Sequence, residues 1–320
     1  MAWVGMLDTP FPAGVISLDV IDPKLLEKEN VFYEEHDSSY GAVFVYEEHL
    51  ASIRSPYQQI DVIRTKEHGK MLFIDHYMMF TEDSEFVYHE MMAHVPLAAH
   101  REAQRVLVIG GGDGGVVREV LKYQRVKKVT LVEIDKTVIE VCRRHFPEMT
   151  GSLEDPRVEV VIGDGVKYVK EVPPGSYDVI IVDSTDPYGV AELLISPEFF
   201  EGCRRTLGDC GLMIQQMASP FFTPDVFVKG FHNMMRVFPH VAPVLVPAPF
   251  YVSSDWALGL ASSSDKFFKK ELPEGWWEPP GRLKYYNPEV HRASFVLPNF
   301  VKDLMEMASR TPVLERKPWL

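Results

Sequence analysis

The sequence predicts an α/β protein whose main domain is a doubly wound, mostly parallel sheet, with a small antiparallel β domain before it. From residue 105 onward, apolar segments rich in Val and Ile alternate with helical patterns, which is typical of a parallel sheet covered on both faces. The first of these segments, Val106–Ile109, runs directly into the glycine cluster Gly110–Gly115, and a helical pattern follows. This strand–turn–helix order is that of a Rossmann-like nucleotide-binding unit.

The individual elements are expected from their apolar patterns. The strands expected in the main domain are Val106–Ile109, Lys128–Glu133, Val158–Ile162, Tyr177–Val182, Gly211–Gln215 and Trp256–Ser262, and its helices include Thr137–His145 and Pro197–Leu207. The strands expected in the small domain are Ala42–Tyr46, Gln59–Ile63, Lys70–Ile74 and Tyr77–Phe80. A helix with acidic residues in its first turn follows, from about Thr81 towards Pro96.

Three regions are therefore expected along the chain. Residues 1–38 lack strong periodicity and are expected to form a partly ordered extension. Residues 39–98 would hold the small β domain and the helix after it, and residues 99–320 the Rossmann-like catalytic domain, with a boundary near residues 97–104. A few short strands are too thin to stand alone, so we expect the small domain to pack against a second copy of the chain.

Composition narrows the class of partner. The chain has 320 residues and a net charge of −13, with the acidic residues spread along it. This disfavours nucleic acid and anionic membranes and suits a cationic small molecule, although solubility alone would also explain it. The three cysteines have no metal-ligand spacing, no signal peptide is evident, and no apolar run approaches membrane-spanning length, so a cytoplasmic location is expected.

An acidic residue, Asp113, lies inside the glycine cluster. A loop that binds pyrophosphate would not carry a carboxylate there, because it would repel the phosphates. The loop therefore indicates a nucleoside whose tail is positively charged.

Further acidic residues follow the next three strands. Glu133 ends the second strand, about twenty residues after the loop, where a carboxylate would bind ribose hydroxyls. Asp164 follows the third strand, and Asp183 and Asp186 follow the fourth. Taken singly, Glu133 could be a solvated strand end and Asp164 a helix N-cap. Together at one sheet edge they predict a nucleoside site with an anionic wall.

Several motifs occur in an order that resembles the spermidine synthase family, the polyamine aminopropyltransferases, between about Gly41 and Val301. They are Tyr-Gln-Gln-Ile-Asp (57–61), Glu-Phe-Val-Tyr-His-Glu-Met (85–91), the glycine cluster with its strand (106–115), Val-Glu-Ile-Asp (132–135), Asp-Pro-Arg (155–157), Gly-Asp-Gly (163–165), Asp-Ser-Thr-Asp-Pro (183–187), Leu-Lys-Tyr-Tyr-Asn (283–287) and His-Arg-Ala-Ser-Phe-Val-Leu-Pro (291–298). The resemblance implies a class I methyltransferase-like fold and transfer of the aminopropyl group of decarboxylated S-adenosylmethionine to an amine, which releases methylthioadenosine. Decarboxylated S-adenosylmethionine would be a co-substrate, and no cofactor or metal is expected.

The resemblance also implies roles for individual residues. On the donor side Asp113 would hold the aminopropyl ammonium, Glu133 the ribose hydroxyls, Asp164 and Gly165 the adenine, and Gln58 the nucleoside side, with Gly110 and Gly112 shaping the loop. On the acceptor side Asp183 would be the proton acceptor, with Asp186, Tyr88 and Tyr251 around the amine and His89 holding an amine end.

The acceptor amine stays open, because most of the departures from the family pattern flank its pocket. Phe250-Tyr-Val-Ser-Ser replaces a common Thr-Tyr-Pro-Ser-Gly, Gln216-Met-Ala-Ser follows the fifth strand, and His76 replaces a usual glycine. Putrescine is the default acceptor, which would give spermidine, and agmatine, cadaverine or a longer polyamine are alternatives. The family implies a homodimer or a homotetramer.

Three other classes of protein fit part of this pattern. A methyltransferase shares this fold, but Asp113 would oppose the carboxylate of intact S-adenosylmethionine. A dinucleotide oxidoreductase fits the glycine spacing, but its pyrophosphate would be repelled. A non-catalytic polyamine-binding homologue is disfavoured because Asp183, Asp186, Tyr88 and Tyr251 are all present.

Overall fold

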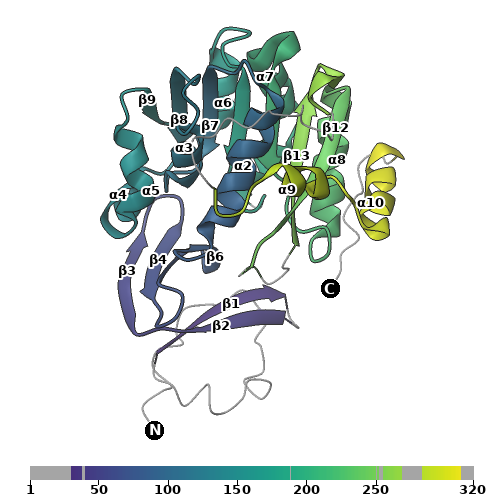
Figure 1. Ribbon diagram of the computed structural model, residues 1–320. Coiled ribbons are helices and arrows are strands. Elements are labelled where there is room, and N and C mark those ends of the chain that lie inside the picture. Colours follow the sequence, from purple (N-terminus) through teal and green to yellow (C-terminus); the bar gives the residue numbers. More distant parts are fainter. Residues whose placement is uncertain are drawn as a thin grey trace. The chain divides into compact units, whose positions relative to one another are not determined.

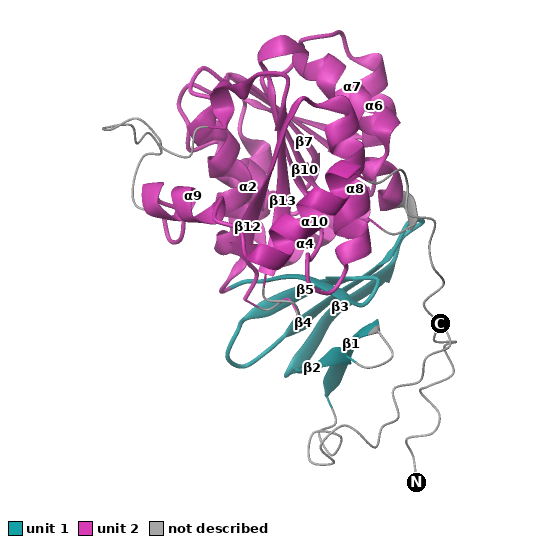
Figure 2. Cartoon of the chain, turned by 90° about the vertical axis from the view of Figure 1, so that its right-hand side faces the viewer, with its two compact units in different colours: residues 1–82 teal, residues 83–320 magenta. Residues whose placement is uncertain are grey.

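The computed structural model describes residues 30–37, 40–187, 189–249, 251, 255–268 and 283–310. The chain divides into two compact units, residues 1–82 and 83–320 (Figure 2). Within the described ranges, no helix has both the length and the apolar character needed to cross a membrane.

Unit 1 is built from antiparallel strands. They are β1 (Val31–Asp37), β2 (Tyr40–Val45), β3 (Glu48–Arg54), β4 (Gln59–Arg64), β5 (Lys70–Ile74) and β6 (Tyr77–Thr81). Strands β1 and β2 pair with each other, and β3 to β6 form a sheet in sequential order. The small antiparallel domain is thus confirmed, and its four expected strands correspond to β2, β4, β5 and β6.

Two strands of unit 1 differ from expectation. Strand β1 lies inside the region 1–38 that was expected to be an extension, so that prediction is wrong for residues 31–37; residues 1–29 and 38 lie outside the described ranges. Long-range packing stabilises β1, since the ring of Phe32 lies 4.3 Å from that of Phe73 and the backbone N–H of Met78 donates to Glu34 (3.3 Å). Strand β3 was missed because it is an edge strand with mostly polar or exposed residues.

The turn between β5 and β6 places two residues in the left-handed region. Asp75 has a φ of 48° and His76 a φ of 70°. Such values at both central residues favour glycine at the second position, which explains why His76 is unusual there.

Replacing His76 with glycine is expected to raise the free energy of unfolding by about 1 kcal/mol, because the strain of a side chain at positive φ disappears. The contact between the rings of His76 and Phe32 (5.8 Å) is lost and offsets part of the gain. Urea denaturation of Lys66→Gly, an exposed residue with a negative φ, is the control and should show no stabilisation. A His76→Gly protein no more stable than the wild type would contradict this account.

Unit 2 holds one large sheet and its helices (Figure 1). Its strands are β7 (Arg105–Gly110), β8 (Lys128–Glu133), β9 (Val158–Ile162), β10 (Val179–Asp183), β11 (Leu212–Gln216), β12 (His240–Pro247) and β13 (Asp255–Ser262). Its α-helices are α2 (Glu85–Ala99), α3 (Gly115–Val120), α4 (Lys136–His145), α5 (Pro147–Thr150), α6 (Gly165–Glu171), α7 (Pro197–Leu207), α8 (Pro224–Val237), α9 (Pro288–Ser294) and α10 (Asn299–Arg310).

The strand order of the large sheet is β12-β13-β11-β10-β7-β8-β9. Strands β11, β10, β7, β8 and β9 are parallel, whereas β13 and β12 are antiparallel additions. The mostly parallel α/β sheet predicted from the sequence is confirmed, with strand ends that differ by at most two residues. Strand β12 was missed because Pro243 and Pro247 interrupt its pattern, and an edge strand tolerates them.

Helices cover both faces of this sheet. Figures 1 and 2 show α2 and α9 on one face and α6, α7, α8 and α10 on the other. Alternate residues of each strand enter separate cores: Val106 and Val108 of β7 join the α2 and α3 side, and Leu107 and Ile109 join the α6 and α7 side. Because both faces of the strand are buried, its sequence is a continuous apolar run.

The boundary between the units corrects the expected one. It falls between Glu82 and Asp83 and not near residues 97–104, so helix α2 belongs to the unit with the large sheet. The reason is packing: Val87, Met91, Met92 and Val95 of α2 are buried in the same core as α3 and strands β7 and β10.

Candidate active site

The predicted residues of unit 2 gather where the strand order reverses. Strands β7 and β10 are neighbours, with Gly110 opposite Asp183 in the register. The next strand after β7 in the chain, β8, lies on the other side of β7. In open α/β sheets such a switch point, at the carboxyl ends of the strands, is where ligands bind.

The glycine loop is locked to the end of β10. The backbone N–H of Gly111 donates to the carbonyl oxygen of Asp183 (2.8 Å). Gly110 has a φ of 79°, and a Cβ at this position would lie 2.0 Å from the same carbonyl oxygen. Glycine at 110 is therefore a condition for bringing the loop and Asp183 together.

Asp183 offers a carboxylate oxygen without a protein partner. Its Oδ1 accepts a hydrogen bond from the hydroxyl of Tyr88 (2.9 Å), whereas its Oδ2 is buried and has no hydrogen-bond partner among the described residues. Burial, followed by the charge of Asp113, raises the pKa of Asp183 to about 7 against the lowering effects of His89 and Tyr88. A buried, unpaired carboxylate oxygen is costly unless a ligand satisfies it.

Asp113 faces the same space from the glycine loop. Its Oδ1 accepts a hydrogen bond from the backbone N–H of Gly115 (2.7 Å) and lies 3.5 Å from Nε2 of His89. One polar atom each from His89, Asp113 and Asp183 lie within 4.8 Å of one another. Two carboxylates and an imidazole thus surround one point, which favours a positively charged ligand there.

His89 is buried and held from both sides. Its Nδ1 lies 2.6 Å from Oε2 of Glu85, one helical turn earlier on α2. Burial alone would lower the pKa of His89, but Asp113, Glu85 and Asp183 outweigh it and raise the pKa to about 9. The ring fits only because residue 115 is glycine, since a Cβ there would lie 2.3 Å from the ring.

Glu133 is not a solvated strand end, because its side chain is only 6% exposed. Its Oε1 accepts the backbone N–H of Asp135 (2.9 Å). Burial, with Asp135 and Asp113 adding to it, raises the pKa of Glu133 to about 7 even though backbone donors such as the N–H of Gly112 oppose this. Gly112 leaves room for the carboxylate, since a Cβ there would lie 3.0 Å from Oε2 of Glu133.

Asp164 caps helix α6, as its alternative interpretation allowed. Its Oδ1 accepts the backbone N–H of Val166 (2.8 Å) and of Lys167 (3.4 Å). Gly165, the first residue of the helix, approaches the sheet so closely that a Cβ would lie 2.4 Å from Cγ2 of Ile109. Both residues therefore lie at the carboxyl end of β9, where the nucleoside base was predicted to bind.

The predicted acceptor residues form a second group. Nε2 of Gln216 donates to Oδ1 of Asp186 (3.1 Å), and Oε1 of Gln216 accepts from Nε1 of Trp256 (2.9 Å). The ring of Tyr251 packs edge-on against that of Trp256 at 4.9 Å. Burial, Asp183 and Tyr251 raise the pKa of Tyr88 well above its usual range, so its hydroxyl stays a hydrogen-bond donor.

Two of the sequence predictions concern residues outside the described part of unit 2. Gln58 belongs to unit 1, in the turn between β3 and β4, where its N–H donates to Oγ of Ser55 (3.0 Å). Residues 250 and 252–254, which carry the departure from the family pattern beside Tyr251, lie outside the described ranges.

Sequence reasoning missed three residues that hold the site together. Glu85 binds His89, Arg118 of α3 binds Glu85, and Gln216 joins Asp186 to Trp256. The i,i+4 spacing of Glu85 and His89 was a usable signal, because it places both on one face of a helix. Gln216 was noted only as a departure from the family pattern beside the acceptor pocket, and no pattern in the sequence pointed to Arg118, which acts across elements.

Comparisons with known proteins agree with this geometry. A family profile described as "Spermine/spermidine synthase domain" matches residues 85–271, and one described as "Spermidine synthase tetramerisation domain" matches residues 30–82. The chain is 38% identical over 279 residues to a polyamine aminopropyltransferase of Clostridium perfringens, covering 86% of this chain and 97% of the relative. It is 40% identical over 283 residues to one of Bacillus mycoides, covering 86% and 98%.

Two solved structures are similar in fold and sequence. Spermidine synthase from Thermotoga maritima aligns with a TM-score of 0.83 at 36% identity, over 88% of this chain and 95% of that one. A spermidine synthase in complex with the transition-state analogue AdoDATO aligns with a TM-score of 0.84 at 36% identity, over 88% and 96%. The chain therefore belongs to the spermine/spermidine synthase family.

Proposed function

We propose that this protein transfers the aminopropyl group of decarboxylated S-adenosylmethionine to an amine. The observation that carries the proposal is the buried, unpartnered Oδ2 of Asp183, close to Asp113 and His89. With His89 protonated, Asp183 and Asp113 together still exceed the positive charge of the ring by one when both are ionised, and a cationic group would balance this excess. The similarity to named polyamine aminopropyltransferases and to a structure with a transition-state analogue supports the same reaction.

The donor would bind along the carboxyl ends of β7, β8 and β9. Asp113 would hold the ammonium of the aminopropyl group. Buried Glu133 would accept hydrogen bonds from the ribose hydroxyls. Asp164 and Gly165 would face the adenine. The assignment of Gln58 to the nucleoside side stays a prediction from the sequence.

The chemistry requires a base but no redox step. The neutral amine nitrogen of the acceptor attacks the aminopropyl carbon bound to the sulfonium, the C–S bond breaks, and its electron pair stays on sulfur in methylthioadenosine. The proton lost by the amine passes to Asp183. An alkylamine with a pKa near that of lysine is neutral in only about one molecule in 2,500 at pH 7, so help in removing a proton matters.

We also propose that the reaction uses neither metal nor cofactor, because a sulfonium is already a good leaving group. One imidazole and two carboxylates can in general bind a metal ion. Here Asp113 and Glu85 favour a proton on the His89 ring, which a metal ion would have to displace.

For this enzyme, kcat/KM for the donor is expected to fall about tenfold per pH unit below about pH 7, since only the ionised form of Asp183 accepts a proton. This follows from the pKa of Asp183, which burial and Asp113 raise to about 7. In kcat the same decline should begin at lower pH, because the bound cationic donor stabilises the carboxylate. Steady-state profiles at constant ionic strength check both, and a kcat limb at higher pH than the kcat/KM limb would contradict the assignment.

Putrescine is the acceptor that we propose, with agmatine, cadaverine or a longer polyamine as alternatives. The test offers each amine with decarboxylated S-adenosylmethionine and follows release of methylthioadenosine. Highest kcat/KM with putrescine supports the default, and preference for another amine replaces it. Release with none of the amines would overturn aminopropyl transfer and revive a polyamine-binding role.

For assembly we propose a homotetramer built through unit 1, because residues 30–82 match the tetramerisation domain of spermidine synthases. Light scattering after gel filtration distinguishes it from the homodimer, the alternative. The cytoplasmic location remains a prediction from the sequence.

A further inference from the structure

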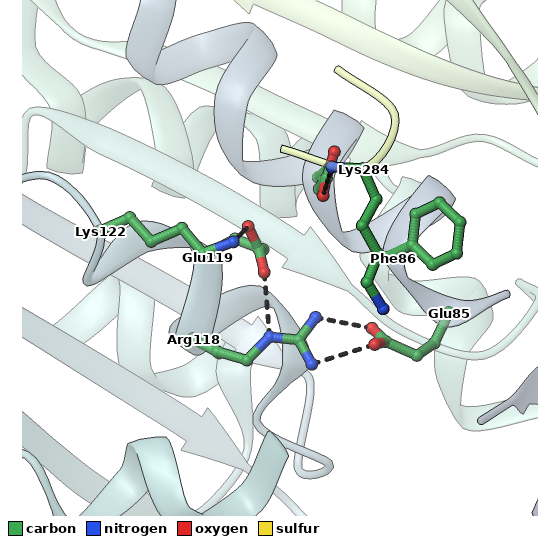
Figure 3. A pocket seen from close by; sticks show the side chains of 7 residues that line it. Glu85, Phe86, Arg118, Glu119, Lys122 and Lys284 are labelled. Atoms are coloured by element: carbon green, nitrogen blue, oxygen red, sulfur yellow. Dashed lines mark hydrogen bonds and ion pairs between the residues drawn. The ribbon is translucent and has the colours of Figure 1, made fainter. Parts of the chain in front are cut away.

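Behind His89, on the side away from the two aspartates, a guanidinium holds the carboxylate that binds the ring. Arg118 donates from both terminal nitrogens to Glu85, at 3.0 Å to Oε1 and 2.8 Å to Oε2. Its Nε donates to Oε1 of Glu119 at 2.9 Å. Figure 3 shows this planar fork facing Glu85. Both residues line a pocket of about 220 Å³, together with Lys122 and Lys284.

We propose that Arg118, acting through Glu85, is a positioning residue that fixes the orientation of the His89 ring and keeps it an imidazolium beside Asp113 and Asp183. The inference rests on the proposed function for its catalytic consequence, but not for the state of the ring itself.

The geometry sets the orientation of the ring. Oε2 of Glu85 accepts from both Arg118 and Nδ1 of His89, at 2.8 Å and 2.6 Å. An ionised carboxylate only accepts hydrogen bonds, so Nδ1 carries a proton. The opposite nitrogen, Nε2, then points to Asp113 at 3.5 Å. Because the Arg118 fork contacts both oxygens of Glu85, the carboxylate cannot rotate freely and the ring is held in this direction.

Among the described residues, the carboxylates that favour the charged form of His89 come from three elements. Glu85 lies on α2, Asp113 in the glycine loop and Asp183 at the end of β10. The ring of Tyr88, also on α2, lies 5.7 Å from that of His89. Burial would raise the pKa of Glu85, but His89 and Arg118 outweigh it and lower the pKa to about 2. The carboxylate is therefore anionic at any working pH and favours the charged ring.

An alternative role for the same contacts would be a proton relay that starts at His89 and passes through Glu85 to the pocket. It would require Glu85, with a pKa of about 2, to take a proton from a ring with a pKa of about 9. Both directions keep the proton on the ring, so His89 acts as a fixed positive charge. Its effect on catalysis is electrostatic: the imidazolium offsets one of two nearby carboxylates and so helps Asp183 to ionise.

The test measures the ring directly and without substrates. The full-length protein with isotope-labelled histidine is titrated by NMR, and the His89 signal is assigned by its loss in His89→Gln. In Glu85→Gln the His89 midpoint is expected to fall by about one pH unit or more, because the ring loses its ionised partner. In Arg118→Met the loss of a nearby positive charge would by itself raise the midpoint, whereas a Glu85 carboxylate that is no longer held against the ring lowers it, so a net fall is expected from the positioning role. Arg118→Lys keeps the charge but not the two-nitrogen fork, so it should restore the midpoint only in part. Arg143→Met removes an exposed ion pair with Glu154 and should change nothing.

Activity gives a second readout. The acid limb of kcat/KM should move to higher pH in Arg118→Met and Glu85→Gln, because Asp183 loses the help of a cationic neighbour. An unchanged His89 midpoint in Arg118→Met overturns the inference even if the enzyme transfers aminopropyl groups. If Arg118→Met does not fold, an unchanged midpoint in Glu85→Gln overturns it. A protein with no aminopropyl transfer but with the expected midpoints would instead contradict the proposed function alone.

Discussion

Replacing Asp183 with asparagine is expected to lower kcat by roughly 10²–10⁴-fold, the range of a lost general base. The amide has nearly the same shape and still accepts the hydrogen bond that Tyr88 donates at 2.9 Å, so the pocket should be preserved. The amide cannot accept the proton of the amine. The buried group that takes the place of Oδ2 is also uncharged.

Binding separates this chemical role from a structural one. Methylthioadenosine binding, measured by calorimetry, should stay within about threefold of wild type, because the nucleoside is assigned to other strand ends. Asp209→Asn, an exposed aspartate away from the site, is the matched control and should keep full activity. Near wild-type kcat in Asp183→Asn would exclude Asp183 as the base.

Replacing Gly110 with alanine is expected to destabilise unit 2 by about 3 kcal/mol or more, because two costs coincide. The new Cβ would lie 2.0 Å from the backbone oxygen of Asp183, and the residue has a φ of 79°. The nearest atom is backbone and belongs to the neighbouring strand β10, so it cannot move aside without breaking the register between β7 and β10.

Two other glycines separate these costs. Gly175 has a φ of 67° but nothing within 4 Å of a Cβ, so Gly175→Ala measures the cost of backbone conformation alone, about 1–2 kcal/mol. Gly151 has neither constraint, and Gly151→Ala should change stability by less than about 0.5 kcal/mol. Urea denaturation provides the comparison. A Gly110→Ala protein that loses no more stability than Gly175→Ala would show that the close approach is not limiting.

The edge of the sheet that carries the site could be predicted because parallel strands end on the same side. The strands before Asp113, Glu133, Asp164 and Asp183 are apolar enough to be recognised one by one. Once they are parallel neighbours, the residues after them must meet at one edge. The strands that were missed, β1, β3 and β12, are antiparallel and lie at sheet edges or in a separate pair, where the apolar pattern is weak or, in β12, interrupted by proline.

The domain boundary could not be predicted for a different reason. Periodicity shows that residues 85–99 form a helix, but it does not show which sheet the helix packs against. The burial of Val87, Met91 and Met92 against the large sheet decides that α2 belongs to unit 2. With it, Tyr88 and His89 join the unit that carries Asp183.

The sequence by itself determined the fold class, the glycine loop and the row of carboxylates, because each depends on patterns within a few consecutive residues. Only the tertiary structure decided which oxygen of each carboxylate is free. It shows Asp183 with one buried oxygen unpaired, and Glu85, the partner of His89, held by Arg118. These states depend on contacts between distant segments, such as Tyr88 with Asp183 and Glu85 with Arg118. Such contacts form when α2 packs on α3 and the sheet, and no local period in the chain encodes them.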